Sequence, residues 1–214
     1  MTWDWNEEKT ARWLEPAMEI PWLALRWKKA GFKTVLDNGC GPGRHAMFFA
    51  REGLSATGMD KSDQAREYLK AWAKAENLPV SVVEGNILKM PFGDSSFDAV
   101  LDYNASYHMC AEDFYRAISE IHRVLKPGGE LYMTLLSQND VKYKCAPPED
   151  HLDEFTLSHA GSTPHFYGKK ESLGEIFAGF EPISVREIKA SAIDSGEERI
   201  HFHLLLRKIC LYFR

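Results

Sequence analysis

Short apolar segments alternate with longer amphipathic segments along most of this sequence. The apolar runs predict strands at residues 33–37, 55–59, 80–84, 97–102, 130–136, 183–189 and 200–208. The segments with helical periodicity predict helices at residues 44–52, 62–76, 112–125 and 170–178. Strands that alternate with helices favour parallel βαβ units, and they predict an α/β fold whose sheet is covered on both faces.

The two ends of the chain depart from this alternation. Only residues 190–199 separate the last two predicted strands, which is too short for a crossover helix and predicts an antiparallel pair. The first thirty residues are rich in tryptophan and predict two short helices, the second ending at Gly31. These helices, in residues 1–31, either form a cover over the functional site or pack as part of the ordinary hydrophobic core.

The length and composition limit the class of protein. A chain of 214 residues suits one domain, and 44% apolar with 27% charged residues is typical of globular proteins. No apolar run approaches a membrane span, and no export signal is evident, so we expect a cytoplasmic protein. A net charge of −5 disfavours nucleic acid as a partner. The oligomeric state stays open.

The cysteines and histidines do not suggest a metal site. Four cysteines are spread along the chain without a CxxC pair, so we expect reduced thiols and neither a zinc site nor a redox dithiol. The histidines also lack the spacing of metal ligands.

A glycine-rich run, VLDNGCGPGRHA, follows the first strand and opens a helix. A dinucleotide-binding loop would need a third glycine where this chain has Arg44. Asp37 stands at the strand end, where a carboxylate would repel a pyrophosphate, and Pro42 removes one N–H from the loop. The loop therefore favours a ligand with a cationic amine and no phosphate, such as S-adenosylmethionine.

An acid at the end of the second strand supports this ligand. Asp60 lies 19 residues beyond Gly41, where its side chain can accept hydrogen bonds from two ribose hydroxyls. The alternative is that Asp60 only caps the following helix.

Five motifs in order resemble those of the class I S-adenosylmethionine-dependent methyltransferases. They are VLDNGCGPGRHA, GMDKS, EGNILKMPF, FDAVLDYNASYHM and RVLKPGGELYMTLLS, and the resemblance covers about residues 30–210. It implies a Rossmann-like, seven-stranded, mostly parallel sheet with helices on both faces and an antiparallel last strand. Within the family the chain is most similar to small-molecule methyltransferases, including the tellurite-resistance type.

The resemblance also implies cofactor-binding roles. Asp37 would lie near the methionine amine, and Asp60 would hold the ribose hydroxyls. Gly39, Cys40 and Gly41 would contact the methionine end and the ribose. Lys61, Asn86 and Ile87 would contact the adenine. Asp102 and Tyr103 would lie near the sulfonium.

Two positions depart from the family pattern. Asn86 replaces an aspartate, and its amide oxygen can still accept a hydrogen bond from the adenine amine. Asn38 replaces an apolar residue, and its side chain can point either to the ligand or to the loop backbone.

The acceptor side is the least defined. If the acceptor must lose a proton, Tyr103, His108 and His165 are the candidate catalytic residues. The long segment 137–168 follows the fifth strand, so we expect a substrate-side insertion in which Tyr143, His165 and Tyr167 shape the acceptor pocket.

Three other functions remain open beside methylation of a small molecule. They are methylation of RNA or protein, binding of S-adenosylmethionine without catalysis, and an NAD-linked dehydrogenase. The first lacks the Asn-Pro-Pro-aromatic motif after the fourth strand, where this chain reads Asp102-Tyr103-Asn104-Ala105. The second lacks an appended partner module, and Asp37 and Pro42 disfavour the third.

Overall fold

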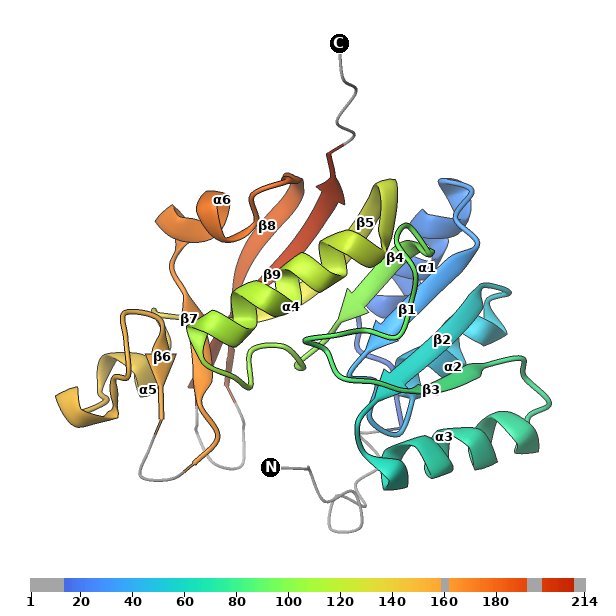
Figure 1. Ribbon diagram of the computed structural model, residues 1–214, viewed down its shortest axis with the longest axis horizontal. Coiled ribbons are helices and arrows are strands. Elements are labelled where there is room, and N and C mark those ends of the chain that lie inside the picture. The colour runs from blue at the N-terminus through green and yellow to red at the C-terminus, as the bar shows by residue number, and fades with distance from the viewer. Residues whose placement is uncertain (1–13, 159–161, 192–197, 210–214) are drawn as a thin grey trace.

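The computed structural model describes residues 14–158, 162–191 and 198–209. Seven of the nine strands in its sheet are those predicted from the sequence, in the order β3-β2-β1-β4-β5-β9-β8 (Figure 1). Their bounds are β1 Thr34–Asn38, β2 Ser55–Asp60, β3 Ser81–Glu84, β4 Phe97–Asp102, β5 Leu125–Ser137, β8 Phe180–Ser191 and β9 Glu198–Lys208. The first five run parallel, and β9 pairs antiparallel with both β5 and β8. The predicted fold class is confirmed.

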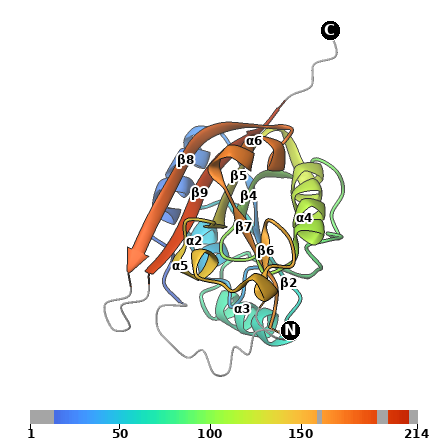
Figure 2. The same cartoon turned by 90° about the vertical axis from the view of Figure 1, so that its left-hand side faces the viewer.

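Helices cover both faces of this sheet (Figure 2). One face packs under α1 (Ile20–Lys29), α2 (Arg44–Arg51) and α3 (Asp63–Ala75), and the other under α4 (Ala111–Val124). The helix ends follow the sequence signals: the Ser62 hydroxyl accepts a hydrogen bond from Ala65 N at 3.3 Å, and Gly31 has a φ of +80° after α1.

The tryptophans of α1 have different roles. Trp27 is fully buried against Phe49, and its indole N–H donates to the buried Glu130 at 3.1 Å, so Trp27 is core. Trp22 is 49% exposed. Trp3, Trp5 and Trp13, on which the prediction of a cover also depends, lie outside the described residues.

The segment predicted as one long loop contains regular structure. It comprises α5 Val141–Lys144, the 3-10 turn η2 Pro148–Asp150, and a hairpin of β6 Thr156–Leu157 with β7 His165–Gly168. β7 runs parallel to the end of β5, where Tyr167 pairs with Leu136. At Leu136 one edge of β5 is paired with β9. β7 therefore pairs with the opposite edge of β5, which is the edge that β4 occupies until it ends. The hairpin therefore lies beyond the carboxyl end of β4.

Two predicted boundaries need correction. The helix expected at 170–178 is only η3 Lys170–Ser172 followed by α6 Leu173–Ile176, and β8 begins at Phe180. The strand expected at 130–136 begins earlier, at Leu125, and contains an irregularity, because Phe97 pairs with Leu125 and Ala99 with Glu130.

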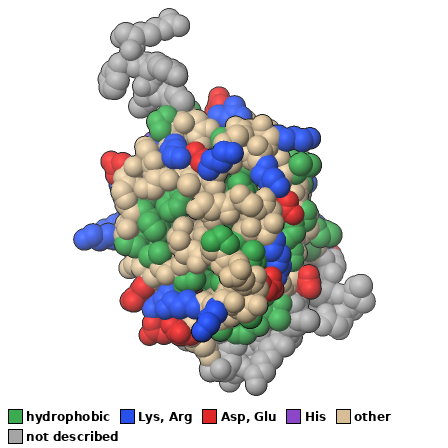
Figure 3. All heavy atoms as spheres, turned by 90° about the vertical axis from the view of Figure 1, so that its right-hand side faces the viewer, with side chains coloured by type: hydrophobic (Ala, Val, Ile, Leu, Met, Phe, Trp, Pro, Cys, Tyr) green, Lys and Arg blue, Asp and Glu red, His purple; other side chains and the backbone are tan. Residues whose placement is uncertain are grey.

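On the face beside β3 and α3, acidic and basic side chains are interspersed (Figure 3). None of the helices among the described residues has the length and apolarity needed to cross a membrane.

Candidate functional site

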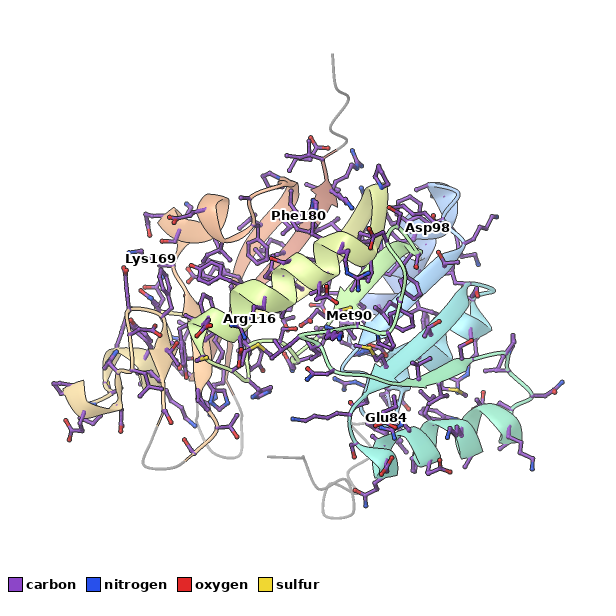
Figure 4. All side chains as sticks on the ribbon, in the orientation of Figure 1. Glu84, Met90, Asp98, Arg116, Lys169 and Phe180 are labelled. Atoms are coloured by element: carbon purple, nitrogen blue, oxygen red, sulfur yellow. The ribbon has the colours of Figure 1, made fainter. Side chains whose placement is uncertain are left out.

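Three aspartates stand at the carboxyl ends of adjacent strands. Asp37 is the fourth residue of β1 and pairs with Gly58 of β2 and Leu101 of β4, while Asp60 and Asp102 end those two strands. Figure 4 shows the polarity of the sheet: Glu84 ends β3 at this edge, whereas Asp98 lies near the amino end of β4. Parallel strands thus bring three carboxylates to one edge, the position at which α/β sheets bind ligands.

The Asp37 side chain is buried at the start of α2. Its carboxylate accepts a hydrogen bond from Ala46 N at 3.1 Å and lies 4.0 Å from Nδ1 of His45. Burial raises the pKa of Asp37 to about 7, and the charges of Asp60 and Asp102 also raise it. A carboxylate therefore occupies the helix N-terminus at which a dinucleotide-binding protein would hold a pyrophosphate.

The N–H groups of the glycine loop are used within the fold. Cys40 N donates to Met59 O at 3.0 Å, Gly41 N to Asp60 Oδ2 at 2.9 Å, and Gly43 N to Cys40 O at 3.0 Å. Pro42 has no N–H. Any backbone contact that Cys40 or Gly41 makes to a ligand must therefore come from a carbonyl oxygen, which suits a cationic donor and not a phosphate.

Gly39 is required by the close approach of two loops. Its φ is +66°, and a Cβ at this position would lie only 2.6 Å from Ala105 Cβ and 3.7 Å from Ile87 Cδ1. The structure thus places Ile87, expected near the adenine, close to the glycine loop.

Asp60 links the glycine loop to the end of β2. Its Oδ1 accepts from Ser62 N at 2.8 Å and its Oδ2 from Gly41 N at 2.9 Å. A carboxylate offers about four lone-pair positions, so each oxygen can accept one more hydrogen bond. Asp60 is only partly buried and Lys61 beside it is exposed, so both are accessible to a ligand.

The structure shows which groups the Asn38 side chain contacts, a point that the sequence left open. Its Nδ2 donates to Asp102 Oδ2 at 2.6 Å, which bridges the ends of β1 and β4. Asp102 also accepts from Ser106 N at 3.0 Å and from the Ser106 hydroxyl, and burial raises its pKa. The Asn38 Oδ1 is buried and has no hydrogen-bond partner among the described residues. Because an orphaned buried acceptor is costly, we expect a donor from an ordered water or from a ligand at this position.

The adenine-side residue Asn86 forms a tight turn after β3. Its side-chain oxygen accepts from Leu88 N at 2.9 Å, and its carbonyl oxygen accepts from Lys89 N at 3.0 Å. The side chain is exposed, and its amide N–H groups can also serve a ligand.

The candidate catalytic residues form two groups on either side of the end of β4. Nδ1 of His108 lies 3.0 Å from Nε2 of His165, so the structure brings these two together. The ring of Tyr103 instead packs 5.1 Å from that of His45. Burial lowers the pKa of His108 to about 4 and raises that of Tyr103 to about 12, so both are neutral near pH 7.

Sequence reasoning missed several residues at this edge. Tyr107 is buried with its ring 4.4 Å from that of His108 and 5.9 Å from that of His201. His201 and His203 alternate with Phe202 in β9 and so share one face of the sheet. This alternation in a strand otherwise rich in leucine was a signal that could have identified them.

The fold and the site together define an α/β protein that binds a cationic ligand at the carboxyl ends of β1, β2 and β4. In the part of the chain that the structure describes, no group of three or more His, Cys, Asp or Glu side chains could hold a metal ion.

Comparison with known proteins identifies the family. Residues 35–129 match the model of the methyltransferase domain family. A phthiotriol/phenolphthiotriol dimycocerosates methyltransferase of Mycobacterium ulcerans is 34% identical over 152 residues, which are 70% of this chain and 51% of that protein. A sterol 24-C-methyltransferase of Kluyveromyces lactis is 30% identical over 169 residues, 75% of this chain and 44% of that protein.

A solved structure shares the fold. The 1,6-didemethyltoxoflavin-N1-methyltransferase of Burkholderia thailandensis, solved with bound 1,6-didemethyltoxoflavin and S-adenosylhomocysteine, has a TM-score of 0.69 at 19% identity, covering 95% of this chain and 84% of that one. The chain belongs to the class I S-adenosylmethionine-dependent methyltransferases. It spans about half the length of the curated relatives it matches.

Proposed function

We propose that this protein binds S-adenosylmethionine and transfers its methyl group to a small-molecule acceptor by in-line displacement. The observation that carries the proposal is the group of Asp37, Asp60 and Asp102 at one sheet edge, beside a loop whose N–H groups at residues 40–43 are used internally or absent. This edge favours a positively charged ligand, and residues 40–43 offer no N–H groups with which to bind a phosphate. When bound, the cofactor supplies an activated methyl group on a positively charged sulfur.

The residues fit the cofactor's functional groups. The orphaned Asn38 Oδ1 and the carboxylate of Asp37 suit the methionine ammonium, and the free lone pairs of Asp60 suit the ribose hydroxyls. The buried carboxylate of Asp102, at the end of β4, balances the positive charge of the sulfonium. The adenine lies against Ile87, with Lys61 and Asn86 at its exposed edge. Gly39, Cys40 and Gly41 contribute carbonyl oxygens.

The reacting atom of the acceptor lies at the end of β4, where the chain that follows this strand meets the β6–β7 hairpin. Phe166 N donates to Tyr107 O at 2.8 Å, and His108 contacts His165, so this insertion is bonded directly to the end of β4. Tyr103, His108 and His165 line the acceptor side. We include in the proposal the predictions that the protein acts in the cytoplasm, as one domain, and without nucleic acid.

Calorimetry with S-adenosylhomocysteine and with NAD tests the cofactor. We expect saturable binding of the first and none of the second; the reverse result contradicts the proposal. For the acceptor side, His165→Ala should reduce methyl transfer to an acceptor found by screening while the affinity for S-adenosylhomocysteine is retained. Unchanged turnover would remove His165 from the site.

A further inference from the structure

A cavity of about 620 Å³ lies on the α1 face of the sheet, away from the glycine loop. Its walls come from α1 and the residues just before it, from β5, and from the β8–β9 hairpin. The side chains that line it include Glu19, Trp22, Tyr132, Ile183, Arg186 and His203.

One part of this cavity is polar. Nδ1 of His203 lies 2.8 Å from the hydroxyl of Tyr132 and 3.5 Å from Oε1 of Glu19. Arg186 pairs directly with His203 across the β8–β9 hairpin and also bonds the Tyr132 hydroxyl. Because Nδ1 is engaged, Nε2 is the nitrogen of His203 left for a ligand. The polar part thus places the guanidinium of Arg186 beside the imidazole of His203, with the carboxylate of Glu19 on the Nδ1 side of that ring. An acidic oxygen group therefore fits at Nε2 and the guanidinium, on the side of the ring away from Glu19.

The other part of the cavity is apolar. Trp22, Ile183 and Leu205 line it. Trp22 keeps half of its surface exposed, although large aromatic side chains are usually covered. An apolar ring against Trp22 would remove this surface from water, which favours binding.

The polar part lies next to the end of β4. The ring of Tyr103 is 6.3 Å from that of His203 and 5.1 Å from that of His45, which begins its helix beside the glycine loop. Tyr103 directly follows Asp102. A molecule whose acidic group lies at His203 therefore presents this group toward the edge where the three aspartates converge.

We propose that this cavity binds an aromatic acid, with its acidic oxygen group at Arg186 and His203 and its ring against Trp22 and Ile183. The molecule so bound is the methyl acceptor, a role that rests on the proposed function. Its ionised oxygen would form a bond to the methyl carbon as the bond from that carbon to sulfur breaks, so the sulfonium charge is neutralised and S-adenosylhomocysteine leaves. The substrate class is therefore a small apolar ring system carrying a carboxylate or phenol oxygen.

The fluorescence of 6-hydroxy-2-naphthoate, titrated with the full chain, tests the binding site. We expect saturable one-to-one binding that Arg186→Gln weakens about tenfold and that Ser184→Trp abolishes by filling the cavity. Ser184 lines the cavity and is only partly buried, so the larger ring need not disturb the core. Arg116→Gln, on the exposed surface of α4, is the matched control and should bind as the wild type does.

The affinity of each variant for S-adenosylhomocysteine, measured separately, should be unchanged. Equal naphthoate affinities in all four proteins, or no saturable binding, would overturn the site. Loss of S-adenosylhomocysteine binding by the wild type would instead contradict the proposed function and leave the naphthoate result as a test of the cavity alone.

A crystal of the ternary complex tests the acceptor role. We expect the naphthoate in the cavity with one oxygen near Tyr103, about 4 Å or less from the sulfur of S-adenosylhomocysteine. Naphthoate bound with neither its carboxylate nor its hydroxyl near Tyr103, or bound elsewhere, would overturn the acceptor role.

Discussion

Protonation of Asp37 should control cofactor affinity near neutral pH. Burial raises its pKa to about 7, so in the absence of a cation the side chain holds a proton that an exposed aspartate would have released. A positively charged ligand favours the ionised form. The affinity for S-adenosylhomocysteine should therefore be fully present above about pH 7 and should be lost as the pH falls through this value.

The size of the effect follows from the pKa. With a value of about 7, roughly nine tenths of Asp37 is protonated at pH 6 and one tenth at pH 8, so the Kd should rise about tenfold between pH 8 and pH 6. Unfolding of the free protein should show the opposite sign. The contribution of Asp37 to stability is present below its usual pKa of 3.8 and is lost as the pH rises through about 7.

Isothermal calorimetry at both pH values measures the affinity. Asp37→Asn keeps an oxygen that can accept from Ala46 N, and it should bind more weakly with little pH dependence. Glu112→Gln, on an exposed carboxylate of α4, should keep the tenfold change of the wild type. His45 beside Asp37 stays neutral over this range, because burial holds its pKa well below 6.5. A wild-type Kd that is equal at pH 6 and pH 8, or an undiminished pH dependence in Asp37→Asn, would refute the reasoning.

Three further substitutions probe the same framework. Gly39→Ala should lower the free energy of unfolding by about 1–3 kcal/mol in thermal melts, because its Cβ would lie 2.6 Å from Ala105 Cβ; an unchanged melting temperature would contradict this. Asp60→Asn should weaken S-adenosylhomocysteine binding about tenfold or more in the same calorimeter, and wild-type affinity would exclude Asp60 from the ribose site. Glu130→Gln, within β5, should cost about 1–3 kcal/mol of stability by denaturant titration without changing cofactor affinity, because Glu130 is buried among Arg26, Trp27 and Arg207.

The parallel sheet and most of its helices could be predicted because they depend on local patterns. Apolar runs fix the strands, and Ser62 and Gly31 mark helix ends through backbone chemistry that operates over a few residues. The hairpin of β6 and β7 could not be predicted. Its strands are short, and β7 is held by Leu136 of β5 and by the backbone of Tyr107, contacts that no local pattern reveals.

The site was predictable to a similar extent. Asp37 and Asp60 follow from their positions at strand ends. The role of Asn38 does not, because its partner Asp102 is distant in sequence and meets it only when β1 pairs with β4. The cavity beside α1 was missed for the same reason. His203 and Arg186 become neighbours only through the pairing of β8 with β9.

The bond from Phe166 N to Tyr107 O has a consequence for how molecules enter and leave. The hairpin is attached by main-chain bonds to both β5 and the chain after β4, so it cannot swing open as a separate flap without breaking them. The acceptor would then enter, and the methylated product leave, on the opposite side of the molecule, between α1 and β8. Amide exchange at Phe166 should accordingly be slow and stay slow during turnover.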